Sequence, residues 1–312
     1  MAEPVEERVI ELIRAKGPQT GSEVLDALSV QGLVLWRACK LSERLEVRVV
    51  GTRYLRLDQR VDGFARLSPS ILREFLTYSV VGLAGDENVL EPSAQRLLRH
   101  IREVSRSKLA LAEEIVGRIW NDFAPSWPEE QRICFILAGD IVYGMAHDVP
   151  RPEHSTGKMV QGSDMDLIVV ADDGAPGDLL QELDRTIYHE KYRTLITPGL
   201  REEIDYVVKG LERVREQLSF DSFKKMVAVK ILQEGVLLSG SETLFEEIKA
   251  MLVRSGATEK LGQMEAAAKA DRQHAEEYLL RADPAHLAKE DLHLFYTGEE
   301  SEEFGDLWGR LP

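Results

Sequence analysis

The stretch from Ile133 to Val170, ICFILAGDIVYGMAHDVPRPEHSTGKMVQGSDMDLIVV, decides the fold expected for this chain. The apolar run Ile133–Leu137 predicts a buried strand that ends at a turn containing Gly139. Residues 141–147 have an amphipathic pattern that predicts a short helix, and a proline-containing loop follows. The apolar segment Leu167–Val170 predicts a second strand.

Two aspartates, Asp164 and Asp166, stand at the start of the second predicted strand. Because alternate residues of a strand point to the same face, their carboxylates should lie side by side, about 7 Å apart along the strand. Two carboxylates this close repel each other unless a cation lies between them, and hard oxygen ligands prefer Mg²⁺ or Mn²⁺. A third carboxylate, Asp205, precedes the pair Val207–Val208 and is expected on a later strand. A solvated strand edge is the alternative explanation of such a pair.

These residues resemble the signature of the nucleotidyltransferase superfamily of DNA polymerase β type. That signature is a Gly-Ser turn after one strand, Asp-x-Asp at the start of the next, and an Asp on a later strand; Gly139, Asp164, Asp166 and Asp205 match it. The resemblance covers about residues 113–241 and implies an α+β fold with a mixed sheet. It also implies transfer of a nucleoside monophosphate from an NTP to a hydroxyl acceptor, with release of pyrophosphate. The three aspartates would then be both the catalytic residues and the ligands of Mg²⁺ or Mn²⁺.

The resemblance suggests that the nucleotide contacts Gly139, Asp140, Ser163 and Lys224. A glycine lets the backbone approach phosphate closely. Asp140 departs from the family pattern, which usually has serine after the glycine. Its carboxylate would either repel the triphosphate or cap the helix predicted from Ile141, where exposed amides favour an anion; we favour the cap. In the following loop, Arg151, His154 and Lys158 could gather phosphates, although a mobile insertion is the simpler interpretation.

The N-terminal 76 residues predict three helices and a hairpin. Apolar periodicity places helices at 5–16, at 23–29 and from Gly32 onward, and the alternating segment 47–55 predicts a hairpin. This order resembles a winged helix-turn-helix domain, which implies binding to nucleic acid or docking to a protein.

Three arginines of the predicted hairpin, Arg48, Arg53 and Arg56, are candidates for contact with nucleic acid or a protein partner. The alternative to nucleic-acid contact is that the domain is a protein-docking module, in which these arginines form ion pairs with Glu43, Glu46 and Asp58. Because the domain is close to neutral overall, we weigh the two interpretations equally.

The sequence predicts four consecutive regions: 1–76 as the winged-helix-like domain, 77–130 as connecting helices, 131–241 as the nucleotidyltransferase core and 242–312 as a C-terminal helical region. Further helices are expected over 178–188 and 222–233, and a strand over 236–238. The C-terminal region ends in an acidic tail at 297–306. The resemblance to nucleotidyltransferases implies that this region shapes the acceptor site or forms a homodimer.

The composition limits the classes of protein to consider. The net charge of −15 disfavours non-specific binding to nucleic acid. No apolar run approaches the roughly 20 residues that a membrane span needs, and the acidic start of the chain predicts a cytoplasmic protein without a secretory signal. Cys39 and Cys134 lie in apolar surroundings and predict buried, reduced thiols rather than a zinc site.

The sequence leaves the acceptor open. An RNA 3′ end, a protein hydroxyl, a small molecule and a second nucleotide are all compatible with the predicted site, with a slight preference for tRNA or another nucleic acid because of the winged helix. A regulator that senses nucleotide through an inactive nucleotidyltransferase domain is the alternative to an enzyme.

Overall fold

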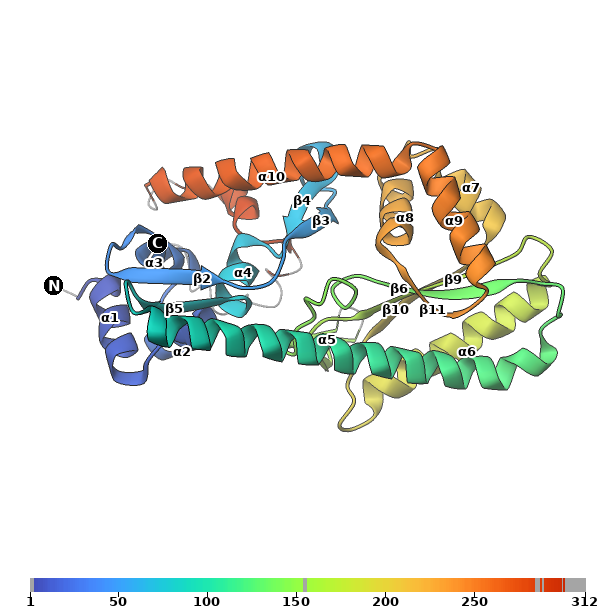
Figure 1. The fold of residues 1–312 in the computed structure, drawn as a ribbon, viewed down its shortest axis with the longest axis horizontal. Coiled ribbons are helices and arrows are strands. Elements are labelled where there is room, and N and C mark those ends of the chain that lie inside the picture. The colour runs from blue at the N-terminus through green and yellow to red at the C-terminus, as the bar shows by residue number, and fades with distance from the viewer. Residues whose placement is uncertain (1–2, 154–155, 284–286, 288, 299, 301–312) are drawn as a thin grey trace. The chain divides into compact units, whose positions relative to one another are not determined.

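The computed structural model describes residues 3–153, 156–283, 287, 289–298 and 300. His154, predicted to contact phosphate, and most of the predicted acidic tail lie outside the described residues. The chain forms an α+β fold, as the sequence predicts (Figure 1). It divides into two compact units, each made of segments that are not contiguous in the sequence. The first unit comprises Met1–Arg56, Ala65–His100 and Glu265–Pro312; the second comprises Leu57–Phe64 and Ile101–Met264.

The first unit combines short helices with a small antiparallel sheet. Its helices are α1 (Val5–Lys16), α2 (Gly21–Leu28), α3 (Gly32–Leu41), α4 (Ile71–Thr77) and the η4 turn (Lys289–Leu294). Its sheet has the order β1 (Gln19–Thr20), β5 (Ser79–Leu83), β2 (Leu45–Val49), while β3 (Tyr54–Leu57) pairs with β4 (Ala65–Ser68). A capping box between Thr20 and Glu23 fixes the start of α2, because each residue binds a backbone amide of the other.

The predicted hairpin over 47–55 is wrong. β2 pairs with β5 instead, with Val47 opposite Val81. Val80 and Val81 are buried in the central strand of the sheet, whereas the chain leaves the sheet after β2 through Gly51, whose φ is 84°. The alternating pattern therefore identified two strands correctly but not their partners, since the buried partner lies about 30 residues further along the chain.

The C-terminal part of α10 (Ala257–Arg281) belongs to the core of the first unit. Leu279 and Phe295 are fully buried together with Trp36 of α3, and the rings of Trp36 and Phe295 lie 5.4 Å apart between centroids. The Arg37 guanidinium donates to the carbonyl of Leu279. The side of α3 that carries Trp36 is thus covered by the end of the chain.

The second unit is built around a mixed sheet with the order β10–β9–β6–β11. β9 and β10 are parallel, whereas β6 is antiparallel to both β9 and β11. The strands are β6 (Ile133–Ala138), β9 (Met165–Ala171), β10 (Ile204–Gly210) and β11 (Val236–Gly240); β7 (Pro150–Pro152) and β8 (Met159–Gln161) form a separate pair. The helices are α5 (Glu87–Phe123, from Ile101 in this unit), α6 (Gly177–Ile196), α7 (Leu211–Gln217), α8 (Phe223–Glu234), α9 (Glu242–Arg254) and the turns η1 (Asp62–Phe64) and η2 (Ala124–Ser126).

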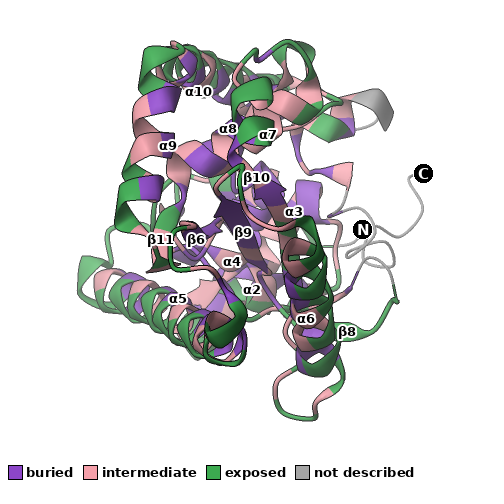
Figure 2. Ribbon diagram, turned by 90° about the vertical axis from the view of Figure 1, so that its right-hand side faces the viewer, coloured by how far each residue is buried: buried purple, intermediate pink, exposed green. Residues whose placement is uncertain are grey.

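Helices cover both faces of this sheet (Figure 1). Phe135, Leu167 and Val169 point toward α5 and α6, where they pack in one apolar cluster with Ile119 and Ile187. The alternate residues of β9 point to the other face, on the side of α8 and α9. Figure 2 shows how thoroughly the central strands are buried. The near-continuous apolar sequences of β6 and β9 follow from this burial on both faces.

The predicted helix over 141–147 is also wrong. The chain makes a turn there, in which the amide of Met145 donates to the carbonyl of Asp140 at 2.9 Å, and Gly144 adopts a φ of 66° that ends it. The next amides bond to hydroxyl groups: Ala146 donates to Ser105 Oγ and His147 to Ser163 Oγ. These distant hydroxyls satisfy the backbone in place of helical hydrogen bonds.

None of the described helices combines the length and the apolar character needed to cross a bilayer.

Candidate functional site

The sheet of the second unit brings the three predicted aspartates to one face. Asp166 of β9 lies directly opposite Asp205 of the parallel strand β10, and opposite Ala138 of β6 on its other side. Register partners of neighbouring strands project to the same face, and Asp164 lies two residues before Asp166, so its side chain shares that face. The three carboxylates therefore gather at the amino-terminal ends of β9 and β10.

Gly139 is part of this arrangement. Its φ is +77°, a conformation that residues with a side chain rarely adopt, and a Cβ atom on it would lie 2.2 Å from Oδ2 of Asp166. The glycine turn after β6 thus leaves space that the Asp166 carboxylate occupies. This close approach explains why a glycine follows the first strand of the site.

Asp140 and Ser163 tie the glycine turn to the segment before β9. Ser163 Oγ donates to Asp140 Oδ2 at 2.9 Å, and the backbone groups of Ser163 and His147 are joined by a hydrogen bond of 3.0 Å. Ser163 is buried. The expected helix cap by Asp140 is wrong because no helix begins there; the carboxylate accepts from a hydroxyl instead.

Two basic side chains approach the aspartates. Arg151 of β7 lies 2.9 Å from Glu203 Oε2 and 3.9 Å from Asp164 Oδ1 through its Nη2 atom, and its Nε donates to the carbonyl of Gly162 at 2.8 Å. Lys191 of α6 lies 2.9 Å from Oδ1 of Asp205, at the edge of the sheet. Arg151 was considered as a phosphate contact from the sequence, whereas Lys191 was not.

The electrostatics show that negative charge is in excess here. Burial raises the pKa of Asp164, Arg151 opposes this shift, and the nearby Asp140 and Asp205 carboxylates reinforce it. The pKa of Asp166 is raised well above its usual range, first by burial and then by the Asp164 and Asp140 carboxylates. An added cation at this place would relieve repulsion that the protein's own side chains leave.

Glu234, at the end of α8, is a site residue that the sequence did not reveal. Its Oε1 accepts from the amide of Gly139 at 3.3 Å, and its Oε2 accepts from the Tyr143 hydroxyl at 2.7 Å. The Lys230 ammonium lies 2.5 Å from the same oxygen. The Glu234 carboxylate therefore binds the backbone amide that, according to the family resemblance, would bind phosphate. A lysine four residues before a glutamate is too common a pattern to have indicated this role.

Lys108 of α5 is a second unforeseen residue. It is buried, its ammonium donates to the carbonyl of Gln161 at 2.6 Å, and it pairs with Glu202. Gln161 and Glu202 each lie three residues before an aspartate of the site. Lys108 thus holds together the two segments that lead into Asp164 and Asp205.

The other predicted contacts lie elsewhere. Lys224 is exposed in the first turn of α8. Arg48 and Arg53 belong to the first unit, where Arg48 pairs with Glu46, Glu87 and Glu91 and Arg53 pairs with Glu74 and Glu276. Arg56 is half-buried in the same unit.

The donor chemistry fits a hard divalent cation, because three carboxylates share one face and outnumber the two cations, Arg151 and Lys191, that approach them. Among the described residues, however, no three acidic, histidine or cysteine side chains are already arranged to hold a metal ion. The Asp205 carboxylate is bound to Lys191. A metal would have to replace that ammonium.

The assignment of this site depends on its own residues, since no family model, curated protein or solved structure matches the chain.

Proposed function

We propose that this protein is a metal-dependent nucleotidyltransferase, which transfers a nucleoside monophosphate from an NTP to a hydroxyl acceptor and releases pyrophosphate. The observation that supports this most is the register of the second sheet, which sets Asp166 opposite Asp205 with Asp164 on the same face. The Gly139 turn, shaped around the Asp166 carboxylate, accompanies these three residues as the family pattern requires.

The aspartates have distinct roles in this proposal. Asp164 and Asp166 would hold the metal ions, and Asp205 would hold metal on the side of the acceptor hydroxyl. Bound Mg²⁺ or Mn²⁺ would supply neutralisation of the triphosphate charge and a lower pKa for that hydroxyl. Asp205 is 53% exposed at the sheet edge, so it can accept the proton of an acceptor that arrives from solvent. Arg151, close to Asp164, offers its guanidinium to the phosphates.

The architecture supports the same family. A mixed sheet with helices on both faces is compatible with a nucleotidyltransferase core. The sheet order β1–β5–β2, with β1 between α1 and α2 and β2 after α3, is what a winged helix would show if residues 50–78 were inserted between its second and third strands. The burial of Trp36 of α3 under the C-terminal segment favours the protein-docking role for that unit over groove binding by α3.

Calorimetric titration with Mn²⁺ tests the proposed site. Wild type should bind Mn²⁺, and Asp164→Ala and Asp166→Ala should lose most of this binding because each removes a carboxylate ligand. Asp178→Ala, which changes an exposed aspartate at the start of α6, is the matched control and should bind as wild type does. Equal Mn²⁺ binding by wild type and Asp164→Ala would refute the site.

One observation favours a second candidate function. Because the Glu234 carboxylate accepts a hydrogen bond from the Gly139 amide, the protein could act as a regulator that senses nucleotide without turnover. The two functions differ in product: an enzyme releases pyrophosphate when Mn²⁺ and NTP are supplied, whereas a sensor binds NTP and leaves it intact.

A further inference from the structure

The C-terminal half of α6 carries two tyrosines that are unusually exposed for large aromatic side chains. Tyr188 is 57% exposed and Tyr192 is 51% exposed. They are four residues apart on a helix and therefore lie on the same face, one turn above the other. Ile196, one further turn along, is 45% exposed. An exposed apolar stripe of this kind indicates a contact surface.

This stripe lies beside the candidate site. Lys191, the residue before Tyr192, binds the carboxylate of Asp205 at 2.9 Å. The hydroxyl of Tyr206, the residue after Asp205, donates to the carbonyl of Asp184 on the same helix at 3.2 Å. Since α6 contacts β10 at Asp205 and at Tyr206, a molecule lying on the tyrosines can reach the Asp205 carboxylate.

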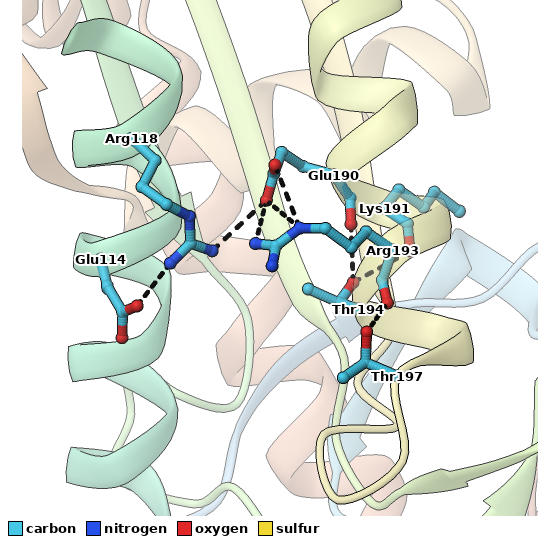
Figure 3. Close-up of polar contacts among 7 residues, drawn as sticks. All are labelled: Glu114, Arg118, Glu190, Lys191, Arg193, Thr194 and Thr197. Atoms are coloured by element: carbon cyan, nitrogen blue, oxygen red, sulfur yellow. Dashed lines mark hydrogen bonds and ion pairs between the residues drawn. The ribbon is translucent and has the colours of Figure 1, made fainter. Parts of the chain in front are cut away.

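Helix α6 is anchored to α5 through Glu190. Glu190 accepts hydrogen bonds from Arg118 of α5 at 3.3 Å and from Arg193 at 2.6 Å, and Figure 3 shows Lys191 leaving the helix on the side away from Arg118. The hydroxyl groups of Thr194 and Thr197 bond to carbonyls of the preceding turn. The bond from Arg118, together with the packing of Leu183 and Ile187 against the apolar side of α5, fixes the orientation of α6 before any ligand binds, which reduces the ordering cost of binding.

The surroundings of the tyrosines are basic, although the whole chain has a net charge of −15. The Lys158 ammonium lies 5.8 Å from the centroid of the Tyr192 ring. Two further cations, Lys191 and Arg193, stand on either side of Tyr192 in the sequence, where they pair with Asp205 and Glu190. Aromatic faces interleaved with positive charge are complementary to unpaired bases joined by phosphates.

We propose that Tyr188 and Tyr192, flanked by Lys158 and Lys191, form a stacking platform for a single-stranded nucleic-acid acceptor whose terminal hydroxyl reaches Asp205. This rests on the proposed function and names the acceptor class. Bases stack on the two rings, and the lysines contact the phosphates. Stacking tolerates any sequence because every base has a π-face, so the platform selects single strands rather than a particular sequence.

Fluorescence anisotropy with a labelled single-stranded RNA of about 12 nucleotides tests the platform directly, in low salt with EDTA so that no turnover occurs. Tyr188→Leu/Tyr192→Leu should weaken binding at least about tenfold, because leucine cannot stack on bases. Tyr188→Phe/Tyr192→Phe should keep wild-type affinity, since phenylalanine keeps the ring. The matched control is Tyr278→Leu, which changes a 44% exposed tyrosine on α10 and should have no effect. A duplex of the same length should bind less tightly than the single strand.

Three results would overturn the platform: no binding of single-stranded RNA by wild type, equal affinity of wild type and the double leucine variant, or a phenylalanine variant as weak as the leucine variant. Calorimetry with Mn²⁺ and NTP separates this outcome from failure of the proposed function. The double leucine variant should bind Mn²⁺ and NTP as wild type does. RNA binding through the tyrosines without any NTP binding would refute the nucleotidyltransferase and leave the platform standing.

Discussion

Each unit contains a cluster of half-buried charged side chains, and the two clusters differ in the balance of positive and negative charge. In the first unit, Arg53 and Arg272 face Glu74 and Glu276: Arg53 lies 2.7 Å from Glu74 and 3.0 Å from Glu276, and Arg272 lies 2.6 Å from Glu276 and 3.2 Å from Glu74. Arg272 also donates to the carbonyl of Pro69 at 2.8 Å. Each carboxylate thus contacts two guanidinium groups.

In the second unit the carboxylates are in excess. Among the described residues around Asp166, the acidic side chains are Asp140, Asp164, Asp205, Glu203 and Glu234, and the basic side chains that pair with them are Arg151, Lys191 and Lys230. A buried balanced cluster fixes α10 and α4 in the core, whereas an unbalanced one keeps repulsion that a further cation or bound protons would relieve. The comparison separates a structural cluster from the one that we propose as a binding site.

The largest effect should come from breaking the balanced cluster. Glu74→Gln keeps the shape of the side chain but leaves Arg53 and the buried Arg272 short of negative charge, so the free energy of unfolding should fall by about 3–5 kcal/mol. Chemical denaturation measures this. Glu91→Gln is the matched control, since Glu91 is an exposed partner of Arg48, and it should change stability little. A loss no larger than that of the control would show that the cluster is not a structural clamp.

Lys209 sharpens the comparison, because it is a buried cation whose ammonium donates to the neutral amide oxygen of Gln217, at 2.7 Å. Burial, helped by Arg213, lowers the pKa of Lys209 to about 8 from its ordinary 10.5. Between these pH values the unfolded chain holds the proton and the folded protein does not, so the free energy of unfolding should rise with pH, by about 2–3 kcal/mol across the window. The Lys209→Met variant should lack this rise when chemical denaturation is measured from pH 8 to 10.5. An equal change in the free energy of unfolding with pH for wild type and variant would contradict the prediction.

The smallest effect should come from removing one charge of the unbalanced cluster. Asp166→Asn relieves repulsion from Asp164 and Asp140, so without metal the variant should be more stable than wild type by about 1 kcal/mol, although it loses a proposed metal ligand. Thermal unfolding in EDTA measures this, with the exposed Asp178→Asn as control. Added Mn²⁺ should stabilise wild type but not the variant. Destabilisation in EDTA would mean that Asp166 is a structural residue.

The sequence predicted what is encoded locally. The apolar runs of β6 and β9 and the periodicity of α5, α6 and α8 specified elements that the structure has at those places. The sequence could not specify pairings over long separations. Ser105 and Ser163, which lie 41 and 16 residues from the amides that they accept from, turned the predicted helix into a turn, and Glu234 reaches Gly139 across 95 residues.

The same distinction between local and long-range information separates the site residues that were predicted from those that were missed. Asp164 and Asp166 were predicted together because a two-residue spacing has a geometric meaning on any strand. That Asp205 is the register partner of Asp166 depends on the order of strands in the sheet, which the spacing alone does not encode. Lys191 and Lys108 were missed because a single lysine in an amphipathic helix gives no sign of the carboxylate that it meets.

Product formation tests the central claim most directly. Wild type, Asp164→Ala and Asp178→Ala would each be incubated with Mn²⁺, single-stranded RNA and each of the four labelled NTPs, and both pyrophosphate and labelled RNA would be measured. The account predicts that wild type and Asp178→Ala release pyrophosphate with at least one NTP, and that Asp164→Ala is slower by about 10³-fold or more, since several kcal/mol of charge stabilisation are lost. Pyrophosphate release by Asp164→Ala at the wild-type rate, or none from wild type with any NTP and acceptor, would contradict it.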